Sequence, residues 1–173
     1  MNGYRVLLFD RNVESRDFSE TLSSFRPDVV GFSVLTGEML RDAITMSKQV
    51  RARNGNTPVV WGGVHPTLLP FQTIVAPYID YIVVGEGEHT FLELLRHLED
   101  KTDIGAIPGV CYLGKEDGKP AYTGDRPFID NLDTLPDPDW ELLNIPAYTI
   151  NITLNTSRVK LPPVQLSITA RRV

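Results

Sequence analysis

Cysteine is almost absent from this 173-residue sequence, which contains only Cys111. A single thiol excludes a disulfide within the chain and any zinc or iron–sulfur site built from several cysteines. Long basic runs are also missing, and the net charge is −5 with a pI near 5.2. A nucleic-acid-binding surface, which needs clustered Lys and Arg, is therefore not expected.

Long hydrophobic stretches are missing as well. No apolar run approaches the roughly 20 residues of a membrane-spanning helix. The start, MNGYRVLLFD, lacks the charged segment and long apolar core of a secretory signal. We therefore expect a cytoplasmic protein with no membrane partner, in which the sequons at Asn151 and Asn155 are chance matches. No Gly-x-Gly-x-x-Gly follows the first apolar run, which disfavours a dinucleotide-binding domain.

Short apolar runs alternate with amphipathic segments over most of the chain. The apolar runs predict buried strands at Tyr4–Phe9, Val29–Val34, Val59–Trp61 and Tyr81–Val84. Helical spacing of apolar residues predicts helices over about 15–25, 38–53, 66–75 and 88–100. Two further runs, Val110–Leu113 and Ala121–Thr123, flank a Glu-Asp-Gly-Lys turn and predict a terminal β-hairpin. This alternation is typical of the α/β class, specifically of a Rossmann-like or flavodoxin-like doubly wound parallel sheet.

The pattern changes near Asp125. Residues 125–150 contain four prolines and many acidic residues without any period, which predicts an extended linker. Beyond it, only Val164–Thr169 resembles another strand. We expect an α/β domain over residues 1–124, the linker over 125–150 and the start of a further domain over 151–173.

Three motifs follow predicted strands: FSVLTG over residues 32–37, WGGVHP over 61–66 and VGEGEHT over 84–90. Open parallel sheets bind ligands beyond the carboxyl ends of their strands, so all three belong to one edge. Gly62 and Gly63 allow close backbone approach. Taken singly, each motif is more often a turn, a helix start or a loop histidine. Their common edge favours a ligand site.

The ordered motifs resemble the cobalamin-binding domain at the N-terminus of cobalamin-dependent radical S-adenosylmethionine enzymes. The resemblance spans about Gly3 to Leu143 and rests on PDVVGFSVLT, GGVHPT, DYIVVGEGEHTFLELL, IPGVCYL and NLDTLPDPDWELL. In that family a Ser-x-Leu after one strand and a Gly-Gly after the next line the slot for the dimethylbenzimidazole tail. Ser33-Val34-Leu35 and Gly62-Gly63 match these signatures, with 26 residues between them.

The resemblance implies that cobalamin is bound by residues of three loops. They are Ser33, Val34, Leu35, Thr36, Gly62, Gly63, His65, Pro66, Gly85, Glu86, Gly87 and Glu88. The Ser33 hydroxyl would meet the benzimidazole nitrogen, and Glu86 with the neighbouring amides would meet corrin amide side chains. An Asp-x-His-x-x-Gly motif is absent, so no protein ligand to cobalt is expected. No Ser-His-Asp or paired-carboxylate arrangement follows from the spacing, so no catalytic residue is expected.

Two departures from the family limit what this chain is expected to do. The family's first strand and helix have no counterpart, so the sheet is incomplete unless Tyr4–Phe9 shifts into the vacant position. The chain also stops before the family's Cys-x-x-x-Cys-x-x-Cys motif, so we expect a chain truncated at both ends. It is expected to be a binding module without turnover.

The resemblance implies a parent radical S-adenosylmethionine methyltransferase or cyclase, whose catalytic domain or chain is the expected partner. The 4Fe–4S cluster and S-adenosylmethionine would belong to that parent and not to this chain. The alternative is a scaffold or interaction domain with the same fold that has lost the cofactor. The missing strand and the absent cobalt ligand favour that alternative.

Overall fold

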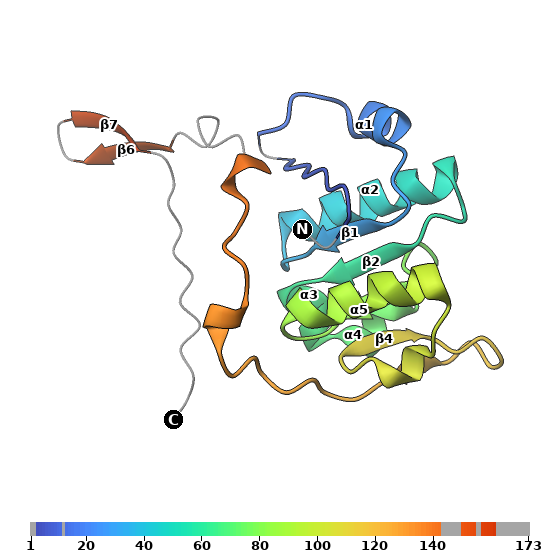
Figure 1. The fold of residues 1–173 in the computed structure, drawn as a ribbon. Coiled ribbons are helices and arrows are strands. Elements are labelled where there is room, and N and C mark those ends of the chain that lie inside the picture. Colours follow the sequence, from blue (N-terminus) through green and yellow to red (C-terminus); the bar gives the residue numbers. More distant parts are fainter. Residues whose placement is uncertain (1–2, 12, 143–149, 155–156, 162–173) are drawn as a thin grey trace. The chain divides into compact units, whose positions relative to one another are not determined.

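A computed structural model of the chain describes residues 3–11, 13–142, 150–154 and 157–161. The chain forms two compact units, one over Phe18–Pro136 and the other from Met1–Asp17 together with Asp137–Val173. The larger unit holds all three predicted site motifs. It is coloured from blue to orange in Figure 1.

The larger unit is built on one five-stranded sheet. Its strands are β1 (Val30–Ser33), β2 (Val59–Gly62), β3 (Tyr81–Val83), β4 (Val110–Leu113) and β5 (Pro120–Tyr122), and they lie in chain order. β1, β2 and β3 are parallel, whereas β4 runs antiparallel to β3 and β5 antiparallel to β4. The prediction of a parallel α/β sheet with a terminal hairpin is confirmed.

Helices connect the parallel strands. α1 (Phe18–Phe25) precedes β1, α2 (Glu38–Arg53) joins β1 to β2, α3 (Val64–Leu68) and α4 (Pro70–Ile74) join β2 to β3, and α5 (Gly87–Asp100) follows β3. Short 3₁₀ helices lie at Ile104–Ala106, Leu132–Thr134 and Trp140–Leu142. Figure 1 shows α5 crossing in front of the sheet.

Both faces of the sheet are covered, as the apolar runs predict. Val60 and Val83 pack with Leu94 of α5 on one face, whereas Trp61 and Ile82 join a larger core under α1, α2 and α4 on the other. Adjacent residues of one strand point to opposite faces, so consecutive apolar residues supply both cores. This is why the strands read as unbroken apolar runs.

Trp61 anchors the larger core directly before the two glycines. Its side chain is buried, and its indole N–H donates to the buried Ser47 hydroxyl at 2.9 Å. The Phe32 ring lies edge-on to Trp61, with 6.4 Å between ring centroids, and the Tyr78 ring is tilted against it at 6.1 Å. A buried indole N–H needs such a partner, because an unpaired one costs about 1–3 kcal/mol.

One predicted strand does not form, and one predicted helix is divided in two. Residues 4–10, which include the predicted strand Tyr4–Phe9, form neither strand nor helix. Within the described residues, β2 is therefore the one strand that pairs with β1. An apolar run becomes a strand only where another backbone pairs with it, and the run itself cannot show that. The predicted helix over 66–75 is two helices. Pro70 disfavours a helical backbone at the preceding Leu69, so α3 ends there, and Pro70 itself is the first residue of α4.

The smaller unit contains a hairpin that the sequence patterns did not predict. β6 (Ile150–Leu154) and β7 (Ser157–Leu161) pair antiparallel, with Ile152 opposite Val159. Their alternation of apolar and polar residues was the available signal. The strand predicted at Val164–Thr169 lies outside the described residues.

Candidate ligand-binding site

The carboxyl ends of the parallel strands form the candidate site, which we call the rim. Ser33 ends β1, Gly62 ends β2, and these two residues are direct partners in the parallel register. Ser33 is exposed and Gly62 is half-buried. The hydroxyl-bearing strand end and the side-chain-free strand end therefore lie next to each other, as the sequence predicts.

Hydrogen bonds tie the loops after β1 and β2 together. Val34 N–H donates to the Gly62 carbonyl at 2.8 Å, and His65 N–H donates to the Val34 carbonyl at 3.0 Å. Thr36 Oγ1 lies 3.3 Å from His65 Nδ1, within hydrogen-bonding distance. Val34 and Pro66 are buried, so the structure places those two predicted site residues in the core beneath the rim.

The two glycines of the rim differ in what the fold demands of them. Gly63 has φ 92° and ψ −170°, a region essentially restricted to glycine. A Cβ atom there would lie 2.8 Å from Val34 N and 3.0 Å from the Val34 carbonyl oxygen. A Cβ at Gly62 would find its nearest atoms at 3.8 and 3.9 Å, both on Val83. The fold therefore explains Gly63, whereas it leaves room for a methyl group at Gly62.

The loop after β3 joins the same rim. Gly85 N–H donates to Thr67 Oγ1 at 3.1 Å, which links this loop to α3. Gly87 begins α5, and the exposed Glu88 lies in its first turn, where a carboxylate is favoured by the helix dipole. Glu86 is half-buried, and its Oε2 accepts a hydrogen bond from Ile129 N–H at 2.8 Å. Thr67 was not among the predicted site residues, although it lies in the GGVHPT motif.

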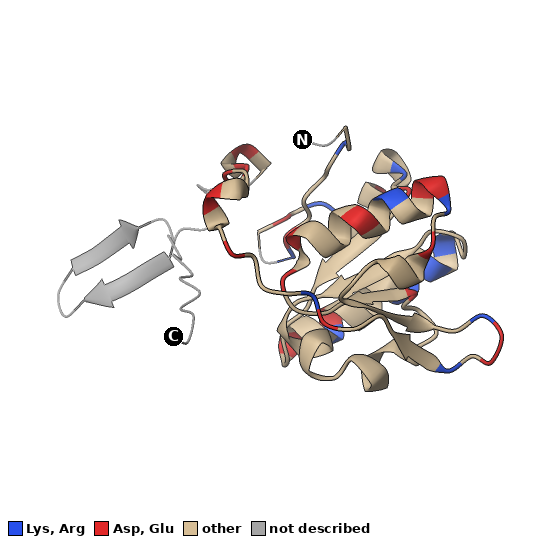
Figure 2. Ribbon diagram, turned by 60° about the horizontal axis from the view of Figure 1, so that its bottom comes forward, with Lys and Arg blue, Asp and Glu red and all other residues tan. Residues whose placement is uncertain are grey.

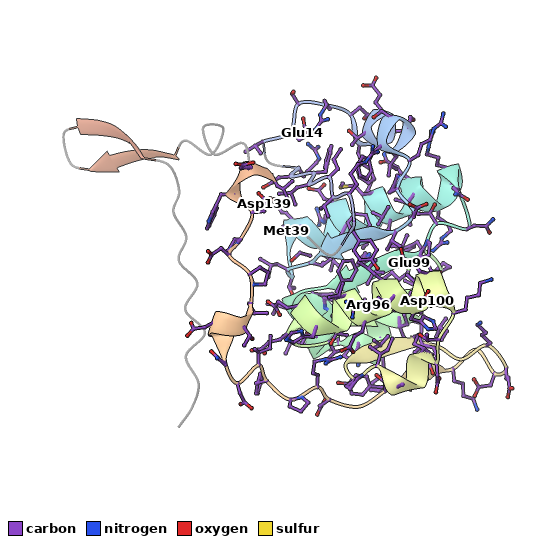
Figure 3. The ribbon with its side chains drawn as sticks, viewed as in Figure 1. Glu14, Met39, Arg96, Glu99, Asp100 and Asp139 are labelled. Carbon is purple, nitrogen blue, oxygen red and sulfur yellow. The ribbon has the colours of Figure 1, made fainter. Side chains whose placement is uncertain are left out.

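Exposed apolar side chains follow the ends of β1 and β2 in the chain. Leu35, Met39 and Val64 are 45%, 44% and 53% exposed. Figure 3 labels Met39 at the start of α2. Leu35 was among the predicted site residues, whereas Met39 and Val64 were not, although Val64 lies in the WGGVHP motif. Met39 and Val64 each lie in the first turn of a helix that follows a strand end, and this position could have marked both as site residues.

The charged side chains of the larger unit carry both signs. Lys, Arg, Asp and Glu of both signs are scattered over the helices and the hairpin turn in Figure 2. Among the described residues, no three His, Cys, Asp or Glu side chains are grouped as metal ligands would be. Burial raises the pKa of Cys111 to about 11, so this thiol is protonated and inert.

Other surface features lie away from the rim. A shallow hollow of about 270 Å³ is lined by Glu93, Arg96, Thr102, Asp103, Ala106 and Ile107, and it contains none of the predicted site residues. Figure 3 labels Arg96 on the second half of α5. No helix in the described part of the chain is long and apolar enough to cross a membrane.

The fold is that of an α/β domain, and the rim is a candidate ligand site at the carboxyl ends of its parallel strands. Residues 1–95 match the B12 binding domain family, and the chain belongs to that family. The family predicted from the five sequence motifs is thus confirmed, and cobalamin is the cofactor for which that family is named.

Two curated relatives are larger proteins. An uncharacterized methyltransferase, PH0819, of Pyrococcus horikoshii is 39% identical over 133 residues, which are 76% of this chain and 28% of that protein. An anaerobic magnesium-protoporphyrin IX monomethyl ester cyclase of Rubrivivax gelatinosus is 34% identical over 170 residues, which are 92% of this chain and 29% of that protein. The chain therefore spans less than a third of the relatives' length.

Two solved structures share the fold. The radical S-adenosylmethionine methyltransferase TsrM from Kitasatospora setae, with cobalamin and a [4Fe–4S] cluster bound, superposes with a TM-score of 0.60 at 22% identity. The match covers 71% of this chain and 25% of TsrM. OxsB, a cobalamin-dependent S-adenosylmethionine radical enzyme with aqua-cobalamin bound, gives a TM-score of 0.51 at 25% identity, over 63% of this chain and 15% of OxsB.

Proposed function

We propose that this chain binds cobalamin at the rim, with the nucleotide tail lying between the ends of β1 and β2. The observation that carries the proposal is the direct pairing of Ser33 with Gly62, where the protein leaves space for a Cβ atom that the sequence does not supply. A flat aromatic base could approach the backbone there. The Ser33 hydroxyl would donate to its free nitrogen.

Burial of the tail would supply most of the affinity. One hydrogen bond from Ser33 is worth only about 0.5–1.5 kcal/mol net. An aromatic group that buries about 150–250 Å² gains on the order of 4–6 kcal/mol at about 25 cal/mol per Å². The exposed Leu35, Met39 and Val64 would add apolar contacts to the corrin.

The residues of the rim fit a cofactor bound through its tail rather than through a histidine ligand to cobalt. His65, the histidine of the GGVHPT motif, is not part of an Asp-x-His-x-x-Gly motif, and its Nδ1 lies beside Thr36 Oγ1. The remaining predicted contacts would come from the backbone of Gly63, Gly85 and Gly87 and from the carboxylate of Glu88. Bound cobalamin would supply a cobalt-held methyl group for transfer.

We further propose that the chain serves a radical S-adenosylmethionine methyltransferase or cyclase as its cofactor module. Its similarity to part of a longer methyltransferase and part of a longer cyclase supports this role. A catalytic domain or chain that carries the 4Fe–4S cluster and S-adenosylmethionine would be the partner. In this proposal residues 1–124 form the cobalamin domain, 125–150 the linker and 151–173 the start of the next domain.

The test is co-elution of hydroxocobalamin with the pure protein in gel filtration, followed by its corrin absorbance. Gly62→Trp would fill the proposed slot and abolish co-elution. Gly55→Trp is the matched control, because Gly55 lies in an exposed turn where an added Cβ would have no atom within 4 Å, and it should bind as the wild type does. Ser33→Ala should weaken binding by about 2- to 12-fold, the equivalent of one hydrogen bond. Wild-type protein that is folded but elutes without the corrin would instead support a scaffold domain that has lost its cofactor.

A further inference from the structure

The segment of residues 124–130, which follows β5 and is called the strap below, is fastened to α5 at two points. At the first, Arg126 Nε donates to Thr90 Oγ1 at 2.7 Å, and the Arg126 guanidinium pairs with the Glu93 carboxylate. Thr90 is completely buried and donates its own hydroxyl proton to the Pro108 carbonyl at 3.1 Å. At the second point, Ile129 N–H donates to Glu86 Oε2.

The spacing of these contacts gives the strap a direction. Glu86, at the N-cap of α5, is followed at intervals of four and three residues by Thr90 and Glu93, which places the three side chains along one face of the helix. Arg126 meets Thr90 and Glu93, whereas Ile129 meets Glu86. The strap therefore runs antiparallel to α5 and ends at the rim.

Between the two fastening points lies Phe128, whose side chain is 69% exposed. Pro127 precedes it and restricts the backbone. A large aromatic side chain gains nothing from exposure to water, yet charged contacts on both sides hold its backbone in place. Ile129 bonds to Glu86, which lies in the loop that follows β3 at the rim, so Phe128 is one residue from a contact with the rim.

We infer that Glu86 and Arg126 are positioning residues that hold Phe128 beside the rim, where its ring contacts the bound cofactor. This inference rests on the proposed function for the identity of the ligand. The two contacts that fasten the strap, Arg126 with Thr90 and Glu93 and Ile129 with Glu86, are called the clamp below and do not depend on the ligand. The Glu86 carboxylate, assigned to corrin amides from the sequence, acts in this account through the strap. Its hydrogen bond to a backbone amide makes the inference testable without any ligand.

The first experiment measures amide hydrogen exchange at Ile129 in the ligand-free protein. Glu86→Ala and Arg126→Ala should each speed exchange there by about tenfold or more, because charge-assisted hydrogen bonds are lost. Glu86→Gln, which keeps size and a weaker acceptor, should have a smaller effect and covers a failure of Glu86→Ala to fold. Exposed Glu116→Ala and Arg96→Ala are the matched controls and should leave Ile129 unchanged. Unaltered protection of Ile129 in folded Glu86→Ala would overturn the clamp.

The second experiment titrates the same proteins with hydroxocobalamin. Phe128→Ala should raise Kd by about five- to tenfold without changing exchange at Ile129, and Glu86→Ala should raise Kd through the strap. Leu132→Ala removes another exposed apolar side chain, 58% exposed, and should bind as wild type. If wild type binds and Phe128→Ala binds equally well, the assignment of Phe128 is wrong. If wild type does not bind at all, the proposed function fails, whereas the clamp is still judged by the exchange data.

Discussion

Replacing Gly63 by alanine should strongly destabilise the fold, whereas the same change at its neighbour Gly62 should not. The backbone of Gly63 lies in a region where a side chain costs on the order of 1–3 kcal/mol. The added methyl group would also lie 2.8 Å from the backbone nitrogen of Val34, which is 0% exposed. Relief requires the end of β1 to move, at a typical overpacking cost of about 1–3 kcal/mol.

The expected loss for Gly63→Ala is therefore about 2–6 kcal/mol, a large part of the roughly 5–15 kcal/mol that stabilises an ordinary domain. A thermal midpoint should fall by at least about 6 °C. Gly62 lacks a positive φ, and its nearest atoms are at 3.8 Å, so Gly62→Ala should stay within about 1 kcal/mol of wild type.

Thermal and urea unfolding of both variants, followed by far-ultraviolet circular dichroism, measure the difference. The reasoning is refuted if Gly63→Ala unfolds within about 1 kcal/mol of wild type, or if the two variants lose equal stability. Hydroxocobalamin binding then gives a second comparison. Gly62→Ala should be folded yet bind more weakly, because the methyl group occupies space that the fold itself does not need.

Three further predictions concern residues away from the rim. Cys111, whose pKa is raised to about 11 by burial, should not react with Ellman's reagent at pH 8 until urea unfolds the protein; fast reaction of the native protein would contradict its burial. Burial, followed by the hydrogen bond to Asp125, raises the pKa of Tyr122 from 10.0 to about 12. The neutral phenol thus stabilises the fold fully below pH 10, and this contribution is lost as the pH rises from 10 to about 12. Urea unfolding over that range should show that the free energy of unfolding falls less in Tyr122→Phe than in the wild type. Ser47→Ala should cost about 1–3 kcal/mol by leaving the Trp61 indole N–H unpaired, measured by urea unfolding against Ser23→Ala, which removes a helical serine hydroxyl whose hydrogen bond to the Ser19 carbonyl is exposed.

Local sequence features predicted most of the larger unit because its elements are bounded by strong signals. Gly37 and Asn54 are the cap residues at the two ends of α2, and the predicted and observed limits of this helix coincide. The hairpin of β4 and β5 followed from two apolar runs around a polar turn. Residues 4–9 show the limit of this approach, since whether an apolar run finds a pairing partner is decided elsewhere in the chain.

Part of the candidate site could also be predicted from local sequence features. Strand ends of a parallel sheet must share an edge, so the adjacency of Ser33 and Gly62 followed from the order of the elements. The contact of Glu86 with Ile129 spans 43 residues and matches no local pattern, so it could not be read from the sequence. Nor could the sequence separate the two adjacent glycines, whose difference lies in a dihedral angle and in the distance to another loop.

Trp61 gives the protein an internal optical reporter. Its ring is 1% exposed and directly precedes Gly62, whereas Trp140, the other indole of the chain, is 58% exposed. Emission from the two should differ in wavelength, since only one is shielded from water. A Trp140→Phe variant would isolate the signal from the end of β2, where a coloured macrocycle would absorb the emitted light. Occupancy of the sheet edge could then be followed by fluorescence quenching in dilute solution, without separating free from bound vitamin.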